Sequence, residues 1–248
     1  MEEILRAEHI QKSFGTHNVL KDITLTLNKG ELVCILGVSG VGKTTLFNVL
    51  SGLTGADDGK VYINGEDVTG ETGHISYMLQ KDMLLPHKKV IDNVSLPMVL
   101  SGTPKKAARE KAAQYFEQFG IAGTEYKYPD QLSGGMRQRA ALLRTYLMNK
   151  DVALLDEPFS ALDTITRSAV HEWYLSVMNE IHLSTLFITH DIDEAILLSD
   201  RIYILRGKPS SITDELIITE PRPRNNDFAL SEDFLNYKRQ IRKLLALS

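Results

Sequence analysis

The feature that most constrains the fold is a glycine-rich loop, Gly37-Val-Ser-Gly-Val-Gly-Lys-Thr-Thr45, which follows the apolar run Leu32–Leu36 and precedes a helix-like segment, Leu46–Leu50. In this context a G-x-x-x-x-G-K-[ST] loop holds a triphosphate, because its glycines let backbone N–H groups approach the phosphates. The N-terminus of the following helix adds a partial positive charge. A plain glycine turn would leave the lysine and the hydroxyl unexplained. The sequence therefore predicts a strand–loop–helix unit that binds a nucleoside triphosphate.

The residue types within this loop predict separate roles. Lys43 supplies a full positive charge, and Thr44 is placed to bring its hydroxyl to Mg²⁺. The residues expected to contact the nucleotide are Gly37, Ser39, Gly40, Val41, Gly42, Lys43, Thr44 and Thr45.

Composition narrows the class of protein. The chain has 248 residues, with 28 Lys plus Arg against 32 Asp plus Glu, so its formal charge of −4 argues against a general nucleic-acid binder. The one cysteine, Cys34, allows no disulfide framework, so we expect a reducing, cytoplasmic location. No apolar run is long enough to cross a bilayer, and Met1–Ile4 does not begin a signal-peptide pattern. Any membrane role is therefore expected to come through a partner.

The N-terminal part reads as β structure and the middle as helical. Residues 4–35 predict short strands separated by turns, for example the alternating Ile23–Leu27. From about residue 82 to 149 the pattern is helical. One helix is expected to start at Thr103-Pro104 and stop at Gly120, and a second is expected to start at Ser133. These helices interrupt the β-containing parts and indicate an inserted helical subdomain.

The C-terminal part returns to strands. Val152–Leu155 and Ser184–Ile188 read as strands on either side of a helical stretch at 164–181, which predicts a βαβ unit with a parallel sheet. Pro221–Asn226 reads as an extended linker, and Ser231 as the start of an amphipathic helix.

Two carboxylates follow the strand at Val152–Leu155. Because the carboxyl ends of parallel strands form the ligand edge of a sheet, Asp156 fits the acid that supports Mg²⁺. Glu157 can reach a water in line with the γ-phosphate. The alternative, a solvated acidic turn before Pro158, is less attractive beside a phosphate loop.

A second anion site is predicted where Ser133-Gly134-Gly135 opens a helix, since free N–H groups, a hydroxyl and a helix N-terminus meet there. Alone, this pattern is more often a plain helix cap. Two such sites in one chain suggest a two-fold dimer in which each subunit contributes one half of each site.

Three further residues gain meaning from their neighbours. His190 ends an apolar strand and could sense the γ-phosphate, although a lone histidine there is usually structural. Gln80 follows another apolar strand and could touch Mg²⁺ or water. Phe14 could stack on the base, although most such aromatics belong to a core or turn.

With these residues in place, the chain resembles the ATP-binding cassette (ABC) family over nearly its whole length. Gly37–Thr45 is similar to its Walker A loop, Leu132–Gln138 to its signature, and Val152–Glu157 to its Walker B strand. By the same resemblance Phe14 is the adenine-stacking aromatic, Gln80 the Q-loop residue, Asp163 the D-loop aspartate and His190 the switch histidine.

The resemblance implies an α/β fold: a P-loop NTPase core with a mainly parallel sheet, an N-terminal antiparallel β subdomain and an inserted helical subdomain. We expect one ABC ATPase domain over 1–248, with the core in 1–82 and 150–220, the helical subdomain in 83–149 and a C-terminal linker and helix in 221–248.

The family also implies a mechanism. Two cassettes sandwich two ATP molecules, and each site joins the loops of one subunit to the signature of the other, where Ser133, Gly134, Gly135 and Asp163 contribute. Glu157 polarises the attacking water, His190 fixes the water and the γ-phosphate, and Mg²⁺ is held by Thr44, Gln80 and Asp156.

Finer resemblance points to the importers of nitrate, sulfonates, taurine and thiamine precursors, on Asp156–Asp163, Thr166-Arg167 and Phe187–Ala195. It implies transmembrane permease subunits that dock at Gln80 and Met83–Lys89, an indirect extracytoplasmic solute-binding protein, and a place on the cytoplasmic face of the membrane.

Two alternatives remain. A soluble, non-transport cassette ATPase acting on DNA or ribosomes is disfavoured, because the interval between loop and signature is too short for a coiled coil and only one cassette is present. A kinase or GTP switch protein would leave the signature and D-loop unexplained.

Overall fold

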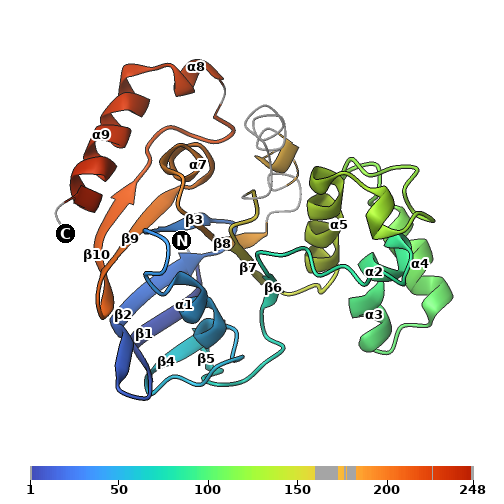
Figure 1. Cartoon of the computed structure of the whole chain (residues 1–248), viewed down its shortest axis with the longest axis horizontal. Coiled ribbons are helices and arrows are strands. Elements are labelled where there is room, and N and C mark those ends of the chain that lie inside the picture. Colours follow the sequence, from blue (N-terminus) through green and yellow to red (C-terminus); the bar gives the residue numbers. More distant parts are fainter. Residues whose placement is uncertain (1, 160–172, 176, 178–182, 225, 247–248) are drawn as a thin grey trace.

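The computed structural model describes residues 2–159, 173–175, 177, 183–224 and 226–246. Within them, ten strands form one mixed sheet in the order β5-β4-β1-β2-β10-β9-β3-β8-β7-β6 (Figure 1). The ladders from β6 through β7, β8 and β3 to β9 are parallel. The ladders among β1, β2, β4 and β5 are antiparallel. The predicted α/β fold, with a parallel core and an antiparallel N-terminal part, is confirmed.

The parallel part contains β3 (Leu32–Leu36), β6 (Ser76–Met78), β7 (Val152–Asp156), β8 (Ser184–Thr189) and β9 (Arg201–Gly207). β10 (Ser210–Ile217) joins β9 antiparallel and touches β2 in parallel, which connects the two parts of the sheet. The antiparallel part contains β1 (Glu3–Phe14), β2 (His17–Asn28), β4 (Asp58–Ile63) and β5 (Glu66–Asp67).

The prediction of short strands over residues 4–35 was wrong for the first two strands. β1 and β2 are each 12 residues long and pair along their length. Shifts of register interrupt the ladder, and His9 and Asp22 both have a φ of 53°. Because a bulge breaks the alternation of inward and outward side chains, the sequence pattern looked like several short strands.

The helices are α1 (Lys43–Leu50), α2 (Val90–Val94), α3 (Leu96–Leu100), α4 (Lys105–Ala113), α5 (Gly134–Tyr146), α7 (Ile192–Leu198), α8 (Asn226–Ala229) and α9 (Glu232–Ala246), with a short 3₁₀ turn at Pro129–Gln131. Helices α2 to α5 lie together at the β6 side of the sheet (Figure 1). The helical stretch predicted at 164–181 falls largely outside the described residues.

The predicted helix from Thr103 to Gly120 is only partly right. α4 begins at Lys105, no side chain caps it, and it ends at Ala113. Beyond it the chain makes tighter turns, in which the amide of Phe116 donates to Ala113 O. These turns carry Phe116 and Phe119 into the core, where both are fully buried. The apolar spacing was read correctly, but the aromatic side chains are buried from a turn rather than from a helix.

The sheet separates two buried apolar clusters. β3 contributes Leu32, Cys34 and Leu36 to one face and Val33 and Ile35 to the other, as the period-two geometry of a strand requires. Strands buried on both faces read as continuous apolar runs, which explains the sequence before the glycine loop.

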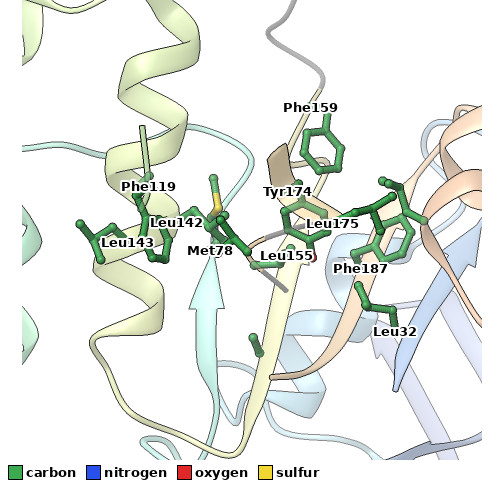
Figure 2. Packing of buried hydrophobic residues seen from close by; sticks show 14 of the residues in the cluster. Leu32, Met78, Phe119, Leu142, Leu143, Leu155, Phe159, Tyr174, Leu175 and Phe187 are labelled. Atoms are coloured by element: carbon green, nitrogen blue, oxygen red, sulfur yellow. The ribbon is translucent and has the colours of Figure 1, made fainter. Parts of the chain in front are cut away.

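Figure 2 shows the packing between α5 and the sheet. Leu142 of α5 lies beside Met78 and near Leu155, and the packing continues through Tyr174 to Phe187, while Leu143 lies farther from the sheet, near Phe119. Helices α2 to α5 and the parallel part of the sheet therefore share one apolar cluster.

The segment expected to be a linker is anchored by Arg224. This side chain is buried, and its guanidinium donates to the carbonyl oxygens of Ile196 (2.8 Å) and Ser199 (2.7 Å) at the end of α7. Burial lowers the pKa of Arg224 to about 10. The predicted amphipathic helix is confirmed as α9, with Phe234 and Ile241 buried. In the described part of the chain no helix combines the length and apolar character needed to cross a membrane.

Candidate active site

The glycine loop lies between β3 and α1, as predicted. A Cβ atom at Gly37 would lie 2.7 Å from Leu205 O, and Gly42 has a φ of 100°, so both positions require glycine. No side chain caps the N-terminus of α1, which leaves its first N–H groups available to an anion.

Lys43 folds back over this loop. Its ammonium donates to Gly37 O (2.8 Å) and Val38 O (3.1 Å). Burial lowers the pKa of Lys43, and the carboxylates of Glu157 and Asp156 oppose that shift. The charge is held at the loop by weak carbonyl acceptors, which a phosphate would replace with stronger, charged ones.

Thr44 and Asp156 join the loop to the end of β7. The Thr44 hydroxyl donates to Asp156 Oδ2 over 2.8 Å, and Asp156 is buried. Burial, together with the nearby Glu157 carboxylate, raises the pKa of Asp156, while Thr44 and Lys43 oppose the shift. A hydroxyl and a carboxylate are oxygen donors of the kind that Mg²⁺ prefers. The residues present fit that ion.

Glu157 lies between two polar side chains from different strand ends. Gln80 Nε2 donates to Glu157 Oε2 over 3.1 Å, and His190 Nδ1 lies 3.2 Å from Glu157 Oε1. The backbone of Glu157 has a φ of 46°, and its N–H donates to Ile188 O over 3.1 Å. A left-handed residue other than glycine costs roughly 1–3 kcal/mol, and such strain concentrates at functional sites. The turn aims this carboxylate at the cavity.

One cavity of about 590 Å³ gathers these side chains. It is lined by Phe14, His17, Val19, Ser39, Gly40, Gly42, Lys43, Thr44, Thr45, Gln80, Asp156, Glu157 and His190. Sequence reasoning missed His17 and Val19. Phe14 and His17 are paired across the turn between β1 and β2, so recognising that hairpin would have placed His17 beside Phe14. Lys12 Nζ lies 5.4 Å from the centre of the Phe14 ring.

Other predicted residues lie away from this cavity. Gly37 contributes its carbonyl to Lys43, and Val41 is buried in the apolar cluster beneath the loop, so neither lines the cavity. Ser133 caps α5 by accepting from the amide of Met136 over 3.2 Å, and Gly134 and Gly135 begin that helix. None of the three lines the cavity. Asp163 lies outside the described residues.

The family of this chain follows from its similarity to known proteins. The family model described as ABC transporter matches residues 20–160, which is more than half of the chain. The chain belongs to the ABC transporter family. The matched range of this cassette holds the glycine loop, Gln80, Ser133 and the Asp156–Glu157 pair, whereas Phe14 and His190 lie outside it.

Several similar proteins are import ATP-binding proteins. The cassette is 41% identical over 210 residues to the formylaminopyrimidine import ATP-binding protein ThiZ of Halalkalibacterium halodurans, covering 84% of this chain and 82% of the relative. It is 36% identical over 235 residues to the aliphatic sulfonates import ATP-binding protein SsuB of Bacillus cereus, covering 95% and 91%.

A solved structure agrees with the fold. The cassette matches the ATP-binding cassette MJ0796, whose structure is dimeric, in a post-hydrolysis state and bound to ADP and Pi. The TM-score is 0.75 at 26% identity, over 88% of this chain and all of that one. The chain is thus an ABC ATPase in sequence and in fold, and its relatives in sequence include import ATP-binding proteins.

Proposed function

We propose that this cassette is the ATP-hydrolysing subunit of an importer, and that Glu157 is its general base. The observation that carries the proposal is the position of the Glu157 carboxylate, shared by Gln80 and His190 at the edge of the cavity that the glycine loop forms. A base must reach the proton that it takes, directly or through one water. A water beside Glu157 would lie between that carboxylate and a triphosphate held by the loop.

The loop residues hold and orient the triphosphate. Lys43 exchanges the carbonyl oxygens of Gly37 and Val38 for phosphate oxygens, while the uncapped N–H groups of α1 add further donors. Phe14, which is half exposed at the cavity, stacks on the base. Thr44, Asp156 and Gln80 would hold Mg²⁺, which would neutralise charge on the phosphates. Glu157 then takes the proton of the attacking water, and His190 orients that water and the γ-phosphate.

The second half of each site comes from another copy. Ser133, Gly134 and Gly135 begin a 13-residue helix away from the cavity of their own chain. The dimeric state of the MJ0796 cassette supports a homodimer in which ATP bridges the loop of one copy and the signature of the other. By family resemblance we propose that Asp163, which lies outside the described residues, also contributes to the nucleotide site.

The import relatives support the transport role. We infer a cassette on the cytoplasmic face of a membrane, with transmembrane permease subunits docked at Gln80 and at Met83–Lys89, where the core of residues 1–82 meets the subdomain of residues 83–149. An extracytoplasmic solute-binding protein would act indirectly. ThiZ and SsuB suggest a small solute of the formylaminopyrimidine or sulfonate type. No observation favours the soluble, non-transport alternative.

Hydrolysis by a Glu157→Gln variant tests the proposed base. The amide keeps the shape of the side chain and one oxygen that can accept a hydrogen bond, but it is not basic enough to take the proton of water, so kcat should fall at least about a hundredfold while the Kd for ATP stays within about twofold. Glu66→Gln, on the exposed β5, is the matched control and should hydrolyse ATP at the wild-type rate. A Glu157→Gln protein that keeps wild-type kcat would remove Glu157 as the base.

A further inference from the structure

The proposed reaction gives no role to Glu194, a buried carboxylate in α7. Glu194 is 5% exposed and lies beside β3 and β8, next to the apolar cluster that contains Cys34 and Ala195. A carboxylate in such surroundings costs several kcal/mol unless hydrogen bonds replace its water. The residues that hydrogen-bond to Glu194 therefore show which part of the structure this carboxylate stabilises.

A directed chain of hydrogen bonds connects Glu194 to the turn that carries His190. The hydroxyl of Thr189, the last residue of β8, donates to Glu194 Oε2 over 2.6 Å. Since a hydroxyl has one proton, its lone pair is left to accept, and it accepts from the amide of Asp191 over 3.0 Å. Thr189 is 2% exposed, so neither bond is shared freely with solvent. These two hydrogen bonds fix Thr189 and Asp191, the residues on either side of His190.

The turn is closed from the other side as well. Asp191 Oδ1 accepts from the amides of Asp193 (2.8 Å) and Glu194 (3.2 Å) at the start of α7. The backbone of Glu194 is therefore tied to Asp191, and its side chain is tied to Thr189. His190 alone projects from this closed turn, with its side chain 58% exposed and its Nδ1 3.2 Å from Glu157.

We propose that Glu194 and Thr189 are positioning residues, which hold the Thr189–Asp191 turn so that the imidazole of His190 faces Glu157. This inference rests on the proposed function, because it assigns the pair to the hydrolytic site. A shift of about 1 Å in a residue that orients water is enough to slow a reaction strongly, whereas the triphosphate is held elsewhere, by the loop of residues 37–45. The pair should therefore affect kcat and leave the affinity for ATP nearly unchanged.

Four variants of the full chain test the pair from both ends, in steady-state hydrolysis of Mg²⁺-ATP. Thr189→Val removes the hydroxyl with almost no change of shape, and Glu194→Met removes the acceptor at similar length. Each should lower kcat at least about fivefold and leave KM within about twofold. Thr189→Ser keeps a hydroxyl, and Glu194→Gln keeps an oxygen that can accept from it. Both should stay within about twofold of the wild-type kcat.

Thr185→Val is the matched control for stability. Thr185 is equally buried on the same strand, and its hydroxyl donates to Leu183 O over 3.0 Å, far from the His190 turn. This variant should lower the Tm without lowering kcat. Should Thr189→Val fail to fold, the comparison of Glu194→Gln with Glu194→Met decides the question.

The outcomes separate this inference from the proposed function. If wild type hydrolyses ATP, Glu157→Gln does not, and Thr189→Val or Glu194→Met keeps the wild-type kcat, only the positioning role is overturned. It is also overturned if the two disruptive variants raise KM as much as they lower kcat, or if Thr189→Ser and Glu194→Gln are as slow as they are. An inactive wild type, or an active Glu157→Gln variant, would instead contradict the proposed function.

Discussion

The two helix N-termini with glycine-rich starts, those of α1 and α5, differ in how complete they are. The N-terminus of α1 has no side-chain cap, carries Lys43 at its first turn and opens into a cavity of about 590 Å³. The N-terminus of α5 is already capped by its own Ser133 hydroxyl and lies outside that cavity. The first is the half that we propose to hold the triphosphate within one chain, whereas the second begins outside that cavity, with the Arg137 guanidinium of its first turn bonded to Leu132 O and paired with Asp82.

This difference teaches that similar local sequences can carry different halves of one function. At α1 the strand β7 places carboxylates beside the loop, so the residues that we propose for binding, metal and water chemistry come together within one chain. At α5 the same kind of N–H donors can act on a phosphate only if another copy brings the phosphate to them. Substitutions in one half at a time test this difference.

The largest effect is expected from Lys43→Ala. Removing the one full positive charge on the loop should weaken ATP binding at least about a hundredfold, since charged pairs with phosphate in a partly buried site are strong. Isothermal titration calorimetry on the single chain measures it. Lys29→Ala, an exposed lysine paired with Glu2, is the control and should bind normally. Unchanged affinity in Lys43→Ala would show that α1 is not the binding half.

Ser133→Ala should separate binding from hydrolysis. ATP binding to the single chain should be unchanged, while hydrolysis at saturating ATP should fall about tenfold or more, because the γ-phosphate loses a donor from the other copy. The lost helix cap also costs about 1 kcal/mol of stability. Ser231→Ala removes a comparable cap, since Ser231 Oγ accepts from the amide of Phe234 over 3.1 Å. If Ser133→Ala and Ser231→Ala hydrolyse ATP at equal rates, Ser133 acts only as a helix cap and has no role in hydrolysis.

Gly37→Ala should show that the loop of α1 is built against the sheet. The new Cβ would meet Leu205 O at 2.7 Å and Val41 Cγ1 at 2.9 Å, which should cost about 1–3 kcal/mol of unfolding free energy. Urea unfolding measures the loss. Gly55→Ala, where a Cβ would meet nothing within 4 Å, should be near neutral. Equal stabilities would mean that the loop has room to move.

The smallest effect is expected in the stability of Asp156→Asn. The pKa of Asp156 is raised, so the folded chain binds this proton more tightly than the unfolded chain, and the charge costs stability at neutral pH. Removing it should raise the Tm of the nucleotide-free protein by a few degrees, while hydrolysis is lost. The gain should shrink as the pH falls through the raised pKa of Asp156. A lower Tm at neutral pH would contradict this reading of the acid.

Much of the fold and of the site could be predicted from the sequence, because short-range patterns of residue types specify it. The apolar run before Gly37 and the acid pair after Leu155 placed two ligand-edge loops, and the parallel-sheet geometry brought them together. The structure also gathers Gln80 and His190 at Glu157, although their roles remain proposals.

What the sequence could not supply depends on three-dimensional packing. The bulges at His9 and Asp22 hid the length of β1 and β2, and with it the position of His17 at the cavity. The turn after Ala113 buries aromatic side chains that had looked helical. Arg224 donates to five backbone carbonyls from what looked like a linker, and three of the acceptors, Ile196, Leu197 and Ser199, lie more than 20 residues earlier in the chain.

The most direct test of the account is the mass of Glu157→Gln in solution, measured by light scattering with and without Mg²⁺-ATP. If ATP joins the loop half of one copy to the signature half of another, the mass should rise from that of one chain, 27.8 kDa, to twice that value. Adding Ser133→Ala to this variant should weaken the rise without weakening ATP binding. A mass that stays at one chain while ATP is fully bound would contradict the central claim.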